Sequence, residues 1–372
     1  MKIMHVITTT GVGGAERMLL KTLKSQVAHA DSTYVVSLLP KGALANEIEQ
    51  YCKRIYFLNL NTALSYFLGV FQYLILTFSV RPHIVQGWMY HGNAFATLSK
   101  FILPFRVRCF WNIRQCLYDI NLEKPLTRAI IRILARCAFC VEKIVNNSRV
   151  SIDQHDRLGI PKKKSLYLPN GFEAKLFSVE PANKIGARNK YGIDLNQILI
   201  GHMASFHQRK DQLSLLEAFA LFNQHFPASK LIIAGRGFDQ SKKFLEKIEL
   251  LGISDCVILL GEVSDTFEFY SALDLFCLSS VNEGFPNVLV EASLSGIPCV
   301  ATAIAENNDI IGNPDFLVAV KKPDELAAAM EKVINMPIPE LAQYVNQQRL
   351  DAVERFSIDA VSSQLYNLYL DN

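Results

Sequence analysis

Short runs of apolar and β-branched residues alternate along the first half of the chain with stretches whose apolar residues recur at helical spacing. Such runs predict strands that are buried on both faces, and the stretches between them predict the helices of parallel crossovers. The expected strands cover residues 3–7, 34–38, 55–58, 84–86, 107–111 and 144–145. The first half therefore predicts an α/β domain, a parallel sheet with helices on both sides.

The same rhythm returns after a polar, proline-containing segment at residues 168–184, which lacks periodicity and predicts an interdomain linker. Strands are expected at residues 198–202, 230–234, 257–260, 275–278, 298–301 and 316–318. We expect an N-terminal domain at 1–175, a C-terminal domain at 185–352, and a segment at 353–372 whose helical pattern at 358–370 crosses back to the first domain. Ligands of paired open sheets bind at the carboxyl ends of the strands, where we expect the domains to face each other across a cleft.

One stretch of the N-terminal half, residues 63–80, carries no charged side chain and is just long enough to span a bilayer. Serine, glycine, glutamine and threonine interrupt it, and a spanning helix there would break the series of strands and helices that the sheet needs. The pattern favours a buried helix. The alternatives are a helix lying on a bilayer surface and a spanning helix.

Composition narrows the classes of partner. The formal net charge of the 372 residues is +3 at pH 7, and the sequence holds no zinc-finger, RNP or basic-helix motif, so we expect no nucleic-acid partner. Eight scattered cysteines, mostly inside apolar runs, indicate buried thiols in a reducing compartment. Cys137 and Cys140 have metal-site spacing but no second pair, so we expect no metal there. The N-terminus has no cleavable leader pattern, and we therefore expect a cytoplasmic protein.

A glycine-rich turn follows the first expected strand. The strand ends in threonines, Gly13 and Gly14 follow, and a helical pattern starts at Arg17. Glycines at such a turn let backbone N–H groups approach a phosphate and direct a helix N-terminus at it. The spacing is not Gly-x-Gly-x-x-Gly and no acidic residue closes a second strand about 20 residues later, which argues against a dinucleotide oxidoreductase. The alternative is a turn that serves only tight packing.

The most informative segment runs from Ser279 to Ala292 and holds two glutamates. Pro286 suits the first turn of a helix and Gly296 ends it, so Glu283 is expected in the loop before the helix and Glu291 on the helix itself. Carboxylates accept paired hydrogen bonds from vicinal hydroxyls, so the two glutamates predict a site for two sugar rings. Solvated surface glutamates are the alternative, which the apolar neighbours of Glu291 disfavour.

These residues resemble the retaining GT-B glycosyltransferases of family 4, the group 1 glycosyl transferases that include bacterial surface-polysaccharide enzymes. The family hallmark is a pair of glutamates with about seven residues between them and a Gly-Phe-Pro loop, which Glu283 and Glu291 match. Further matches, in order, are Gly-Gly-Ala-Glu-Arg at 13–17, Asn-Ser at 147–148, Pro-Asn-Gly at 169–171, Leu-Glu-Ala-Phe at 216–219, Ile-Ile-Ala-Gly-Arg-Gly at 232–237 and Gly-Ile-Pro-Cys-Val-Ala-Thr at 296–302. The resemblance covers nearly the whole chain and implies a GT-B fold of two Rossmann-like domains, with the donor site in the C-terminal one.

The resemblance implies a role for each matched donor position. Glu283 would contact the transferred sugar, Glu291 the donor ribose, and Lys210 the donor diphosphate. The turn at Gly13 and Gly14 would face that diphosphate from the other domain. The remaining donor-binding positions are Val263, which would line the base, and the loop of Gly284, Phe285, Pro286 and Asn287, whose backbone would bind sugar hydroxyls.

One donor position departs from the family pattern. The resemblance implies an arginine five positions before the lysine, and Ser205 stands there instead. A departing diphosphate gains negative charge at the transition state, so the loss of a cation matters. His207, Arg209 and Arg236 are the candidates to replace it.

Two residues of the N-terminal half complete the expected site. His91 follows the expected strand at 84–86 and matches a histidine near the sugar in the family, which implies a catalytic and acceptor-binding role beside Glu283 and Lys210. Arg114 follows the strand at 107–111 and is expected to meet an acceptor phosphate. The alternatives are a structural histidine and a solvated arginine.

The implied reaction transfers a sugar from a UDP- or GDP-linked donor to a hydroxyl of an acceptor saccharide and keeps the anomeric configuration. No Asp-x-Asp pair is present to hold a divalent cation, so we expect metal-independent transfer without a cofactor. One rival is a nucleotide-sugar epimerase of the same architecture, a reading that lacks the paired-glutamate motif. The other is a non-catalytic sugar-nucleotide-binding protein, which Ser205 favours.

The acceptor is expected to be a lipid-linked saccharide at the cytoplasmic face of a membrane. Between Lys100 and Lys164 basic residues outnumber acidic ones, which concentrates positive charge in the domain expected to bind acceptor. Arg128, Arg132 and Arg136 recur every four residues among apolar neighbours and place three cations along one side of a helix. Such a face suits an anionic membrane surface, with residues 63–80 beside it for apolar insertion, and the alternative is a solvated face over an ordinary core.

Overall fold

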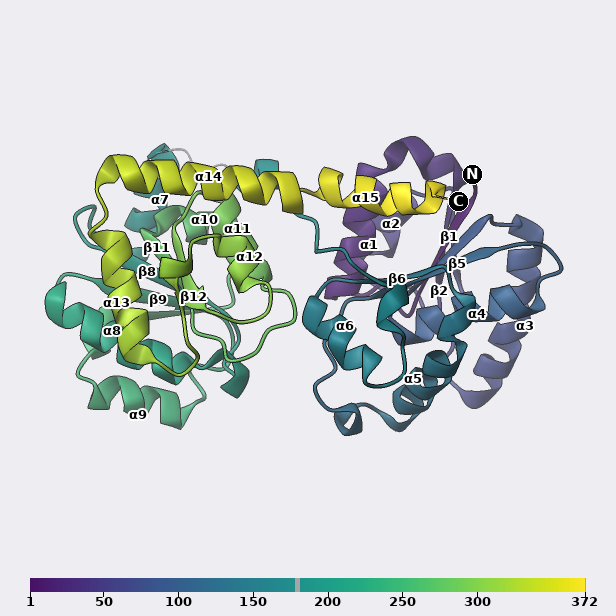
Figure 1. Cartoon of the computed structure of the whole chain (residues 1–372), viewed down its shortest axis with the longest axis horizontal. Coiled ribbons are helices and arrows are strands. Elements are labelled where there is room, and N and C mark those ends of the chain that lie inside the picture. Colours follow the sequence, from purple (N-terminus) through teal and green to yellow (C-terminus); the bar gives the residue numbers. More distant parts are fainter. Residues whose placement is uncertain (178–180, 372) are drawn as a thin grey trace. The chain divides into compact units, whose positions relative to one another are not determined.

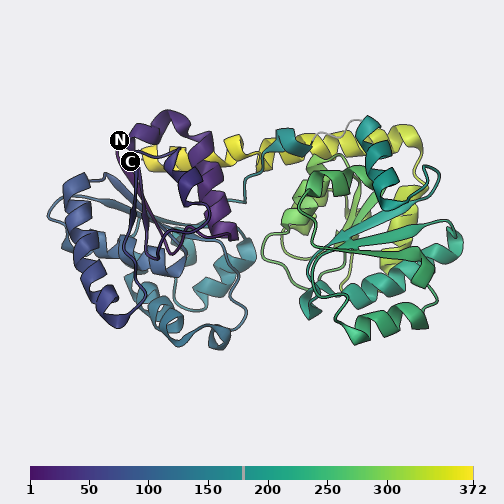
Figure 2. The same cartoon turned by 180° about the vertical axis from the view of Figure 1, so that it is seen from behind.

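The computed structural model describes residues 1–177 and 181–371, and the chain divides into two compact units (Figure 1, Figure 2). One unit comprises Met1–Gly171 and Ile358–Asn372, and the other comprises Phe172–Ser357. The chain therefore leaves the first unit once and re-enters it with its last helix. Each unit is built on its own parallel sheet, the prediction made from the alternating pattern, which is confirmed.

The first unit has a seven-stranded sheet with the order β3-β2-β1-β4-β5-β6-β7. All six strands expected in this half are present, and the edge strand β7 was not expected. None of its three residues is buried, so no apolar run marks it. The strands are β1 (Ile3–Ile7), β2 (Thr33–Ser37), β3 (Arg54–Phe57), β4 (Ile84–Trp88), β5 (Arg108–Ile113), β6 (Lys143–Asn146) and β7 (Ser165–Tyr167).

Helices cover both faces of this sheet. One apolar core is shared by α3, α4 and α5, and the core on the opposite face is shared by α1, α2 and α15. The helix expected at residues 358–370 is therefore confirmed as α15, within the first unit. The helices are α1 (Gly14–Ser25), α2 (Ala45–Glu49), α3 (Ala63–Val80), α4 (Met89–Ile102), α5 (Pro125–Cys137), α6 (Arg149–Asp156) and α15 (Ile358–Leu370).

Helix α3 is buried on one side only. A capping box between Thr62 and Ser65 starts it, and the hydroxyl of its buried Tyr73 lies 2.6 Å from the Ser99 hydroxyl of α4. The expectation of a buried helix is wrong for the other side, because α3 lies at the outside of its layer and large apolar side chains remain exposed there. Within residues 1–177 and 181–371, no helix has the length and hydropathy that a membrane span requires.

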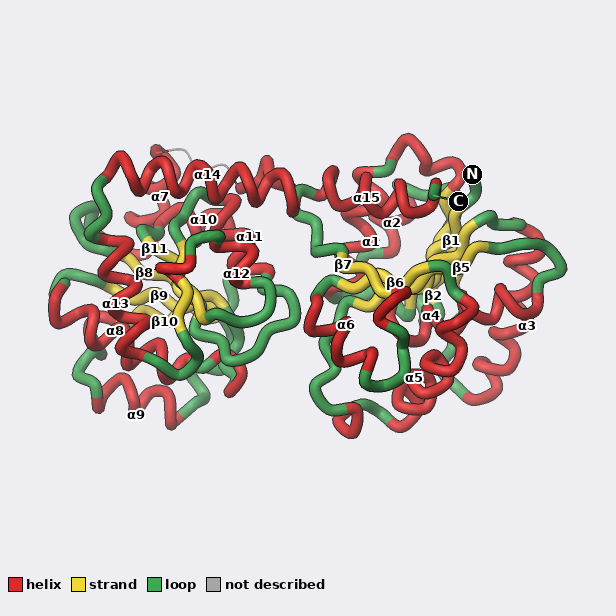
Figure 3. Tube along the Cα trace, in the orientation of Figure 1, coloured by secondary structure: helices red, strands yellow, loops and turns green. Residues whose placement is uncertain are grey.

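The second unit has a six-stranded sheet with the order β10-β9-β8-β11-β12-β13, and all six expected strands are present (Figure 3). The strands are β8 (Leu199–Met203), β9 (Lys230–Ala234), β10 (Val257–Gly261), β11 (Leu275–Leu278), β12 (Cys299–Thr302) and β13 (Leu317–Val318). The helices are α7 (Pro181–Tyr191), α8 (Gln212–His225), α9 (Lys242–Leu250), α10 (Thr266–Ala272), α11 (Asn287–Leu294), α12 (Asn307–Ile311), α13 (Pro323–Ile334) and α14 (Ile338–Phe356).

Each sheet has one point where the order of its strands reverses. In the first sheet this point lies between β1 and β4, and in the second it lies between β8 and β11. Loops that leave two neighbouring strands in opposite directions open a crevice at the carboxyl ends of those strands, which is where open α/β sheets bind ligands. We therefore expect a ligand-binding site in the loops that follow these four strands.

A neutral histidine is buried in an interior strand of each sheet. His5 of β1 accepts a hydrogen bond from the Trp88 indole at 3.1 Å, and His202 of β8 lies 2.9 Å from the Cys277 carbonyl oxygen. Burial lowers the pKa of each imidazole to about 4. Both imidazoles therefore stay neutral in the folded protein at pH values near 6.5, where an exposed histidine is partly protonated.

We expect acid to destabilise both units between pH 6.5 and pH 4. In that range the unfolded histidines take up protons that the folded ones refuse, so their stabilising effect is complete above pH 6.5 and is lost as the pH falls. The loss is about 1 kcal/mol per histidine at pH 5.5. Thermal unfolding at pH 7.5 and pH 5.5 should show a smaller pH dependence in the double variant His5→Gln, His202→Gln than in the wild type. An equal dependence in both proteins would contradict this account.

Candidate active site

Two loops at the carboxyl ends of β8 and β11 form the candidate site of the second unit. The first loop contains the 3-10 turn η6 (Gln208–Lys210), and the second leads from β11 into α11. They are joined at the backbone, because the Arg209 carbonyl accepts a hydrogen bond from the Val281 amide at 2.8 Å. The Ser279 hydroxyl also donates to the Lys210 carbonyl at 2.9 Å. The reversal of strand order thus brings two loops that are distant in sequence into one structure.

An ion pair lies at the centre of these loops. The Lys210 ammonium lies 2.6 Å from Glu283 Oε1, and the Ser280 hydroxyl donates to the same oxygen at 2.6 Å. Glu283 is only 7% exposed, and a carboxylate with so little contact with water needs such charge-assisted partners. The pair therefore fixes a cation and an anion side by side at the carboxyl end of the sheet.

Glu291 lies on α11 and Glu283 in the loop before it, as predicted. The Tyr270 hydroxyl of α10 donates to Glu291 Oε2 at 3.0 Å and contacts the Val288 carbonyl oxygen at 3.1 Å. Burial, together with the nearby Glu291 carboxylate, raises the pKa of Tyr270 well above its ordinary value. The phenol therefore stays protonated and holds the half-buried glutamate in one orientation.

The loop between the two glutamates is anchored by an aromatic side chain. Phe285 is buried, with its ring 6.4 Å from that of Phe172 and 5.8 Å from that of Phe356. Pro286 is also buried and precedes the first residue of α11, Asn287. In the described part of the chain no side-chain hydrogen bond caps this helix, and its first turn is held by backbone bonds from the Asn287 amide to the Phe285 carbonyl and from the Leu289 amide to the Pro286 carbonyl, each 3.0 Å. Gly284, beside Phe285, is half-buried.

The three cations proposed to replace the missing arginine differ in their surroundings. Arg236 forms an exposed ion pair with Glu262 at 2.9 Å, and the His207 ring accepts a hydrogen bond from the Arg209 amide at 3.1 Å as the cap of η6. Arg209 itself is exposed on the same turn as Lys210. Arg209 is therefore the candidate whose backbone is tied directly to the lysine and to the second loop.

Two further donor positions lie at neighbouring strand ends of the second unit. Ser205 is exposed in the loop after β8, and its carbonyl accepts a hydrogen bond from the Gln212 amide group at 3.0 Å. Val263 is half-buried in the turn between β10 and α10. Both residues lie at the carboxyl edge of the sheet, the edge that carries Lys210 and Glu283.

The glycine turn of the first unit follows β1. Gly13 is the N-cap residue of α1 and Gly14 its first residue. A Cβ atom added at Gly14 would meet nothing within 4 Å, so packing inside this unit does not require a glycine there. The interpretation of the turn as a device for tight packing is therefore not supported at Gly14.

His91 lies in the first turn of α4, directly after β4 and half-buried. The N-terminus of α4 is pressed against the sheet, because a Cβ added at Gly92 would lie 2.3 Å from the Val6 carbonyl oxygen. Burial lowers the pKa of His91, so its imidazole is neutral at pH 7. Among the described residues none forms a hydrogen bond with this side chain, which disfavours a purely structural role.

Arg114 is held inside the first unit. Its guanidinium donates to Asn112 Oδ1 at 2.8 Å, to the Pro169 carbonyl at 2.9 Å and to Asn170 Oδ1 at 2.9 Å, and it lies over the Trp88 ring. These bonds fix the last segment of the unit before the chain leaves it. They exclude the alternative of a solvated side chain, and the expected contact with an acceptor phosphate stays a prediction.

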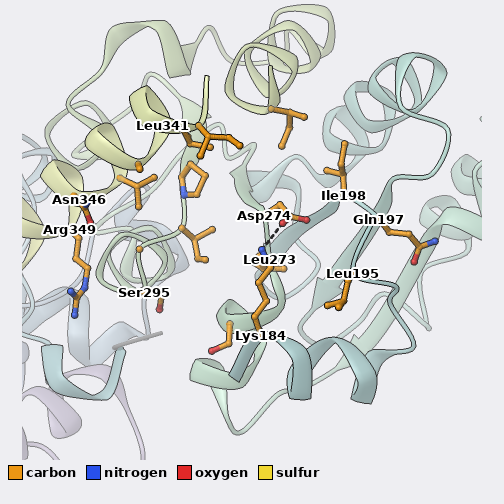
Figure 4. Close-up of a pocket in the computed structure, with 18 of the residues that line it drawn as sticks. Lys184, Leu195, Gln197, Ile198, Leu273, Asp274, Ser295, Leu341, Asn346 and Arg349 are labelled. Carbon is orange, nitrogen blue, oxygen red and sulfur yellow. Dashed lines mark hydrogen bonds and ion pairs between the residues drawn. The ribbon is translucent and has the colours of Figure 1, made fainter. Parts of the chain in front are cut away.

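A cavity of about 660 Å³ opens at the opposite, amino-terminal edge of the second sheet (Figure 4). Ile198, Asp274 and Pro298, which line it, directly precede β8, β11 and β12. Lys184 and Asp274 form an ion pair of 2.7 Å in its wall. The cavity contains none of the residues of the two site loops and is not part of the candidate site.

Sequence reasoning missed the partners that orient the glutamates. Lys210 and Glu283 are 73 positions apart, and Tyr270 is 21 positions from Glu291, so no spacing along the chain connects either pair. Ser280 lies three residues before Glu283 and follows a serine at the end of an expected strand. Site residues of parallel sheets gather at the carboxyl ends of strands, and this position was the one signal in the sequence for Ser280.

Known proteins similar to this chain are glycosyltransferases. The family model Glycosyl transferases group 1 matches residues 183–350. The putative glycosyltransferase EpsF of Bacillus subtilis is 32% identical over 327 residues, covering 83% of this chain and 81% of the relative. The capsular polysaccharide biosynthesis glycosyltransferase CapH of Staphylococcus aureus is 23% identical over 317 residues, covering 83% of each.

Solved structures show the same fold. Anabaena Alr3699/HepE in complex with UDP superposes with a TM-score of 0.84 at 21% identity over 100% of both chains. WaaG, a glycosyltransferase involved in lipopolysaccharide biosynthesis, has a TM-score of 0.68 at 16% identity, again over 100% of both chains. The chain belongs to the group 1 glycosyltransferases and has their GT-B fold of two Rossmann-like domains.

Proposed function

We propose that the protein is a retaining glycosyltransferase that moves a sugar from a UDP- or GDP-linked donor to a hydroxyl of a lipid-linked saccharide during bacterial surface-polysaccharide synthesis. The observation that carries the proposal is the ion pair of Lys210 and Glu283 at the strand reversal of the second sheet. Support for a nucleotide-sugar donor comes from the solved complexes of Anabaena Alr3699/HepE with UDP and UDP-glucose, and support for the polysaccharide role comes from the named relatives.

The ion pair leaves one carboxylate oxygen of Glu283 for the donor. Lys210 and Ser280 both bond Oε1, and no described residue bonds Oε2. That oxygen accepts hydrogen bonds from hydroxyls of the transferred sugar. Lys210 holds Glu283 on one side and reaches the donor diphosphate with its remaining N–H groups.

The reaction breaks one bond and forms another at the anomeric carbon. The bond between this carbon and the diphosphate oxygen breaks, and its electron pair leaves with the diphosphate. The acceptor oxygen bonds to the same face of the oxocarbenium-like sugar, and the acceptor hydroxyl proton passes to the departing phosphate. Lys210, with Arg209 beside it, stabilises the charge that develops on the leaving group, and no metal ion is required.

Transfer assays with labelled UDP- and GDP-sugars and a lipid-linked saccharide test the proposal. We expect labelled sugar in the lipid-linked product, and we expect transfer to continue in excess EDTA. Interconversion of the donor sugar without transfer would indicate an epimerase, and binding without turnover would indicate a non-catalytic protein. Loss of transfer in EDTA that magnesium or manganese restores would overturn the metal-free mechanism.

Replacing Arg209 with alanine is expected to lower turnover by about tenfold or more, because the departing diphosphate loses one of its two cations. His207→Ala and Arg236→Ala are the matched controls and should change turnover less. Steady-state rates at saturating donor measure the effect. Wild-type turnover in Arg209→Ala, with a large loss in either control, would move the role to that residue.

The lipid-linked acceptor requires the enzyme to work at a membrane surface, and the first unit supplies cations for it. Arg132 and Arg136 of α5 are exposed and Arg128 is half-buried, so two of the three expected cations face solvent. Exposed Leu126 and Ile133 lie on the same helix. This combination supports peripheral binding at the anionic inner face of the cell membrane.

A further inference from the structure

We infer that the outer face of α3 is the surface by which the protein inserts into the bilayer. The inference deepens the proposed function, from which it takes only that the acceptor is lipid-linked. The face, called the α3 stripe below, consists of six exposed side chains: Leu64, Phe67, Leu68, Phe71, Ile75 and Phe78.

The α3 stripe is continuous along the helix. Leu64, Phe67, Phe71, Ile75 and Phe78 follow one another at intervals of three or four residues, and Leu68 lies four residues after Leu64 and three before Phe71, which places all six on one side. Phe67 is 62% exposed and Ile75 is 71% exposed. The stripe extends over most of an 18-residue helix, roughly 27 Å at 1.5 Å per residue.

The α3 stripe is held toward the outside, because the opposite side of α3 forms hydrogen bonds with buried groups of the first unit. The Tyr73 hydroxyl is bonded to the Ser99 hydroxyl at 2.6 Å, and both groups are buried. Thr77 is also buried, 3.9 Å from the sulfur of Met4 in β1. The exposed orientation of the stripe is therefore fixed by the fold.

The chemistry of the stripe matches lipid better than protein. A protein interface carries about one hydrogen bond per 100–200 Å² of buried area and a polar rim. The exposed side of α3 offers only Gln72 and Ser79 as polar side chains and has no charge. A helix that is apolar on all sides is normally covered, either by a protein core or by membrane.

The charges around the stripe suit an anionic bilayer. Between Glu49 and Asp119 the chain has no acidic residue, and seven lysines and arginines lie in that interval. Exposed Arg81 follows the last residue of α3, with its guanidinium 5.5 Å from the Phe78 ring centre. Phe105, beside exposed Arg106, lies 6.2 Å from the same ring. Cations thus border the apolar surface at the C-terminal end of the helix.

A tryptophan placed in the stripe reports insertion directly. Both native tryptophans, Trp88 and Trp111, are fully buried, so Phe71→Trp adds an exposed indole. On vesicles of phosphatidylglycerol and phosphatidylcholine we expect its emission to shift to shorter wavelength and to be quenched by brominated acyl chains. Leu250→Trp, at an 80% exposed position of the second unit, should show neither change. Equal quenching in both variants, or none in either, would overturn the inference.

A polar version of the stripe tests its contribution to binding and to activity. The triple variant Phe67→Gln, Phe71→Gln, Ile75→Gln should lower vesicle partitioning at least tenfold. The matched control Leu176→Gln, Leu250→Gln, Leu350→Gln replaces the same number of exposed apolar side chains in the second unit and should bind as the wild type. Both variants should keep wild-type transfer to a water-soluble acceptor, and only the stripe variant should lose transfer to the lipid-linked one.

The outcomes separate this inference from the proposed function. Vesicle binding through the stripe in a protein without transfer activity would refute the function and leave the surface in place. Full vesicle binding by the stripe variant would overturn the surface whatever the activity. A wild-type dimer that the stripe variant converts to a monomer, with vesicle binding unchanged, would show that a second copy of the chain covers the stripe.

Discussion

Replacing Lys210 with alanine is expected to lower the turnover number about a hundredfold or more. The diphosphate gains charge as the bond to the sugar breaks, and a cation fixed at that position stabilises the transition state by roughly 3 kcal/mol. The same substitution leaves the buried Glu283 carboxylate without its ammonium partner. Steady-state rates at saturating donor measure the loss, and circular dichroism confirms that the variant folds.

Lys247→Ala is the matched control for this substitution. Lys247 forms an ion pair with Glu217 in the same unit, and its side chain is 24% exposed, close to the 26% of Lys210. It lies on α9 and belongs to neither of the two site loops. We expect nearly wild-type turnover in this variant. Equal losses in Lys210→Ala and Lys247→Ala would mean that the first variant fails for reasons of stability alone.

Replacing the two glutamates should separate turnover from donor binding. Glu283→Gln is expected to lower turnover about a hundredfold with a small change in donor affinity, because Glu283 is proposed to contact the reacting sugar. Glu291→Gln is expected to weaken donor binding about tenfold with a smaller effect on turnover, because Glu291 is proposed to hold the donor ribose. Calorimetric titration with the nucleotide sugar and steady-state kinetics measure the two quantities.

A variant of the tyrosine partner tests whether Glu291 acts from a fixed orientation. Tyr270→Phe removes the hydroxyl that donates to Glu291 at 3.0 Å and keeps the aromatic packing. It should weaken donor binding in the same direction as Glu291→Gln, by a smaller factor, and leave turnover unchanged. Identical affinities and rates in Glu283→Gln and Glu291→Gln would refute the division of roles.

The fold was largely predictable because buried parallel strands appear in the sequence as short apolar runs. The run at residues 275–278 is apolar throughout and the run at residues 3–7 is apolar except for His5, and their lengths match strands rather than helices. The edge strand β7 escaped prediction because none of its residues is buried, so no apolar run marks it in the sequence. The exposure of α3 also escaped, because a helix without charged residues and with few polar ones gives little sign of which side faces the core.

The site was predictable where a local signal marked a position along the chain. Pro286 and Gly296 delimit α11, and this placed Glu283 in the loop and Glu291 on the helix. The contacts of these glutamates depend on which strands become neighbours, and the pattern of a single strand does not contain that information. The bonds of Arg114 to the backbone of residues 168–169 escaped prediction for the same reason.

The anomeric configuration of the product tests the central claim most directly. With an α-linked nucleotide sugar as donor, the proton NMR spectrum of the isolated product reports the configuration of the new glycosidic bond through its one-bond and vicinal coupling constants. The account predicts an α-linked product from wild-type enzyme, formed about a hundredfold more slowly by Glu283→Gln. A β-linked product, or a wild-type enzyme that yields only free sugar or an epimerised donor, would contradict it.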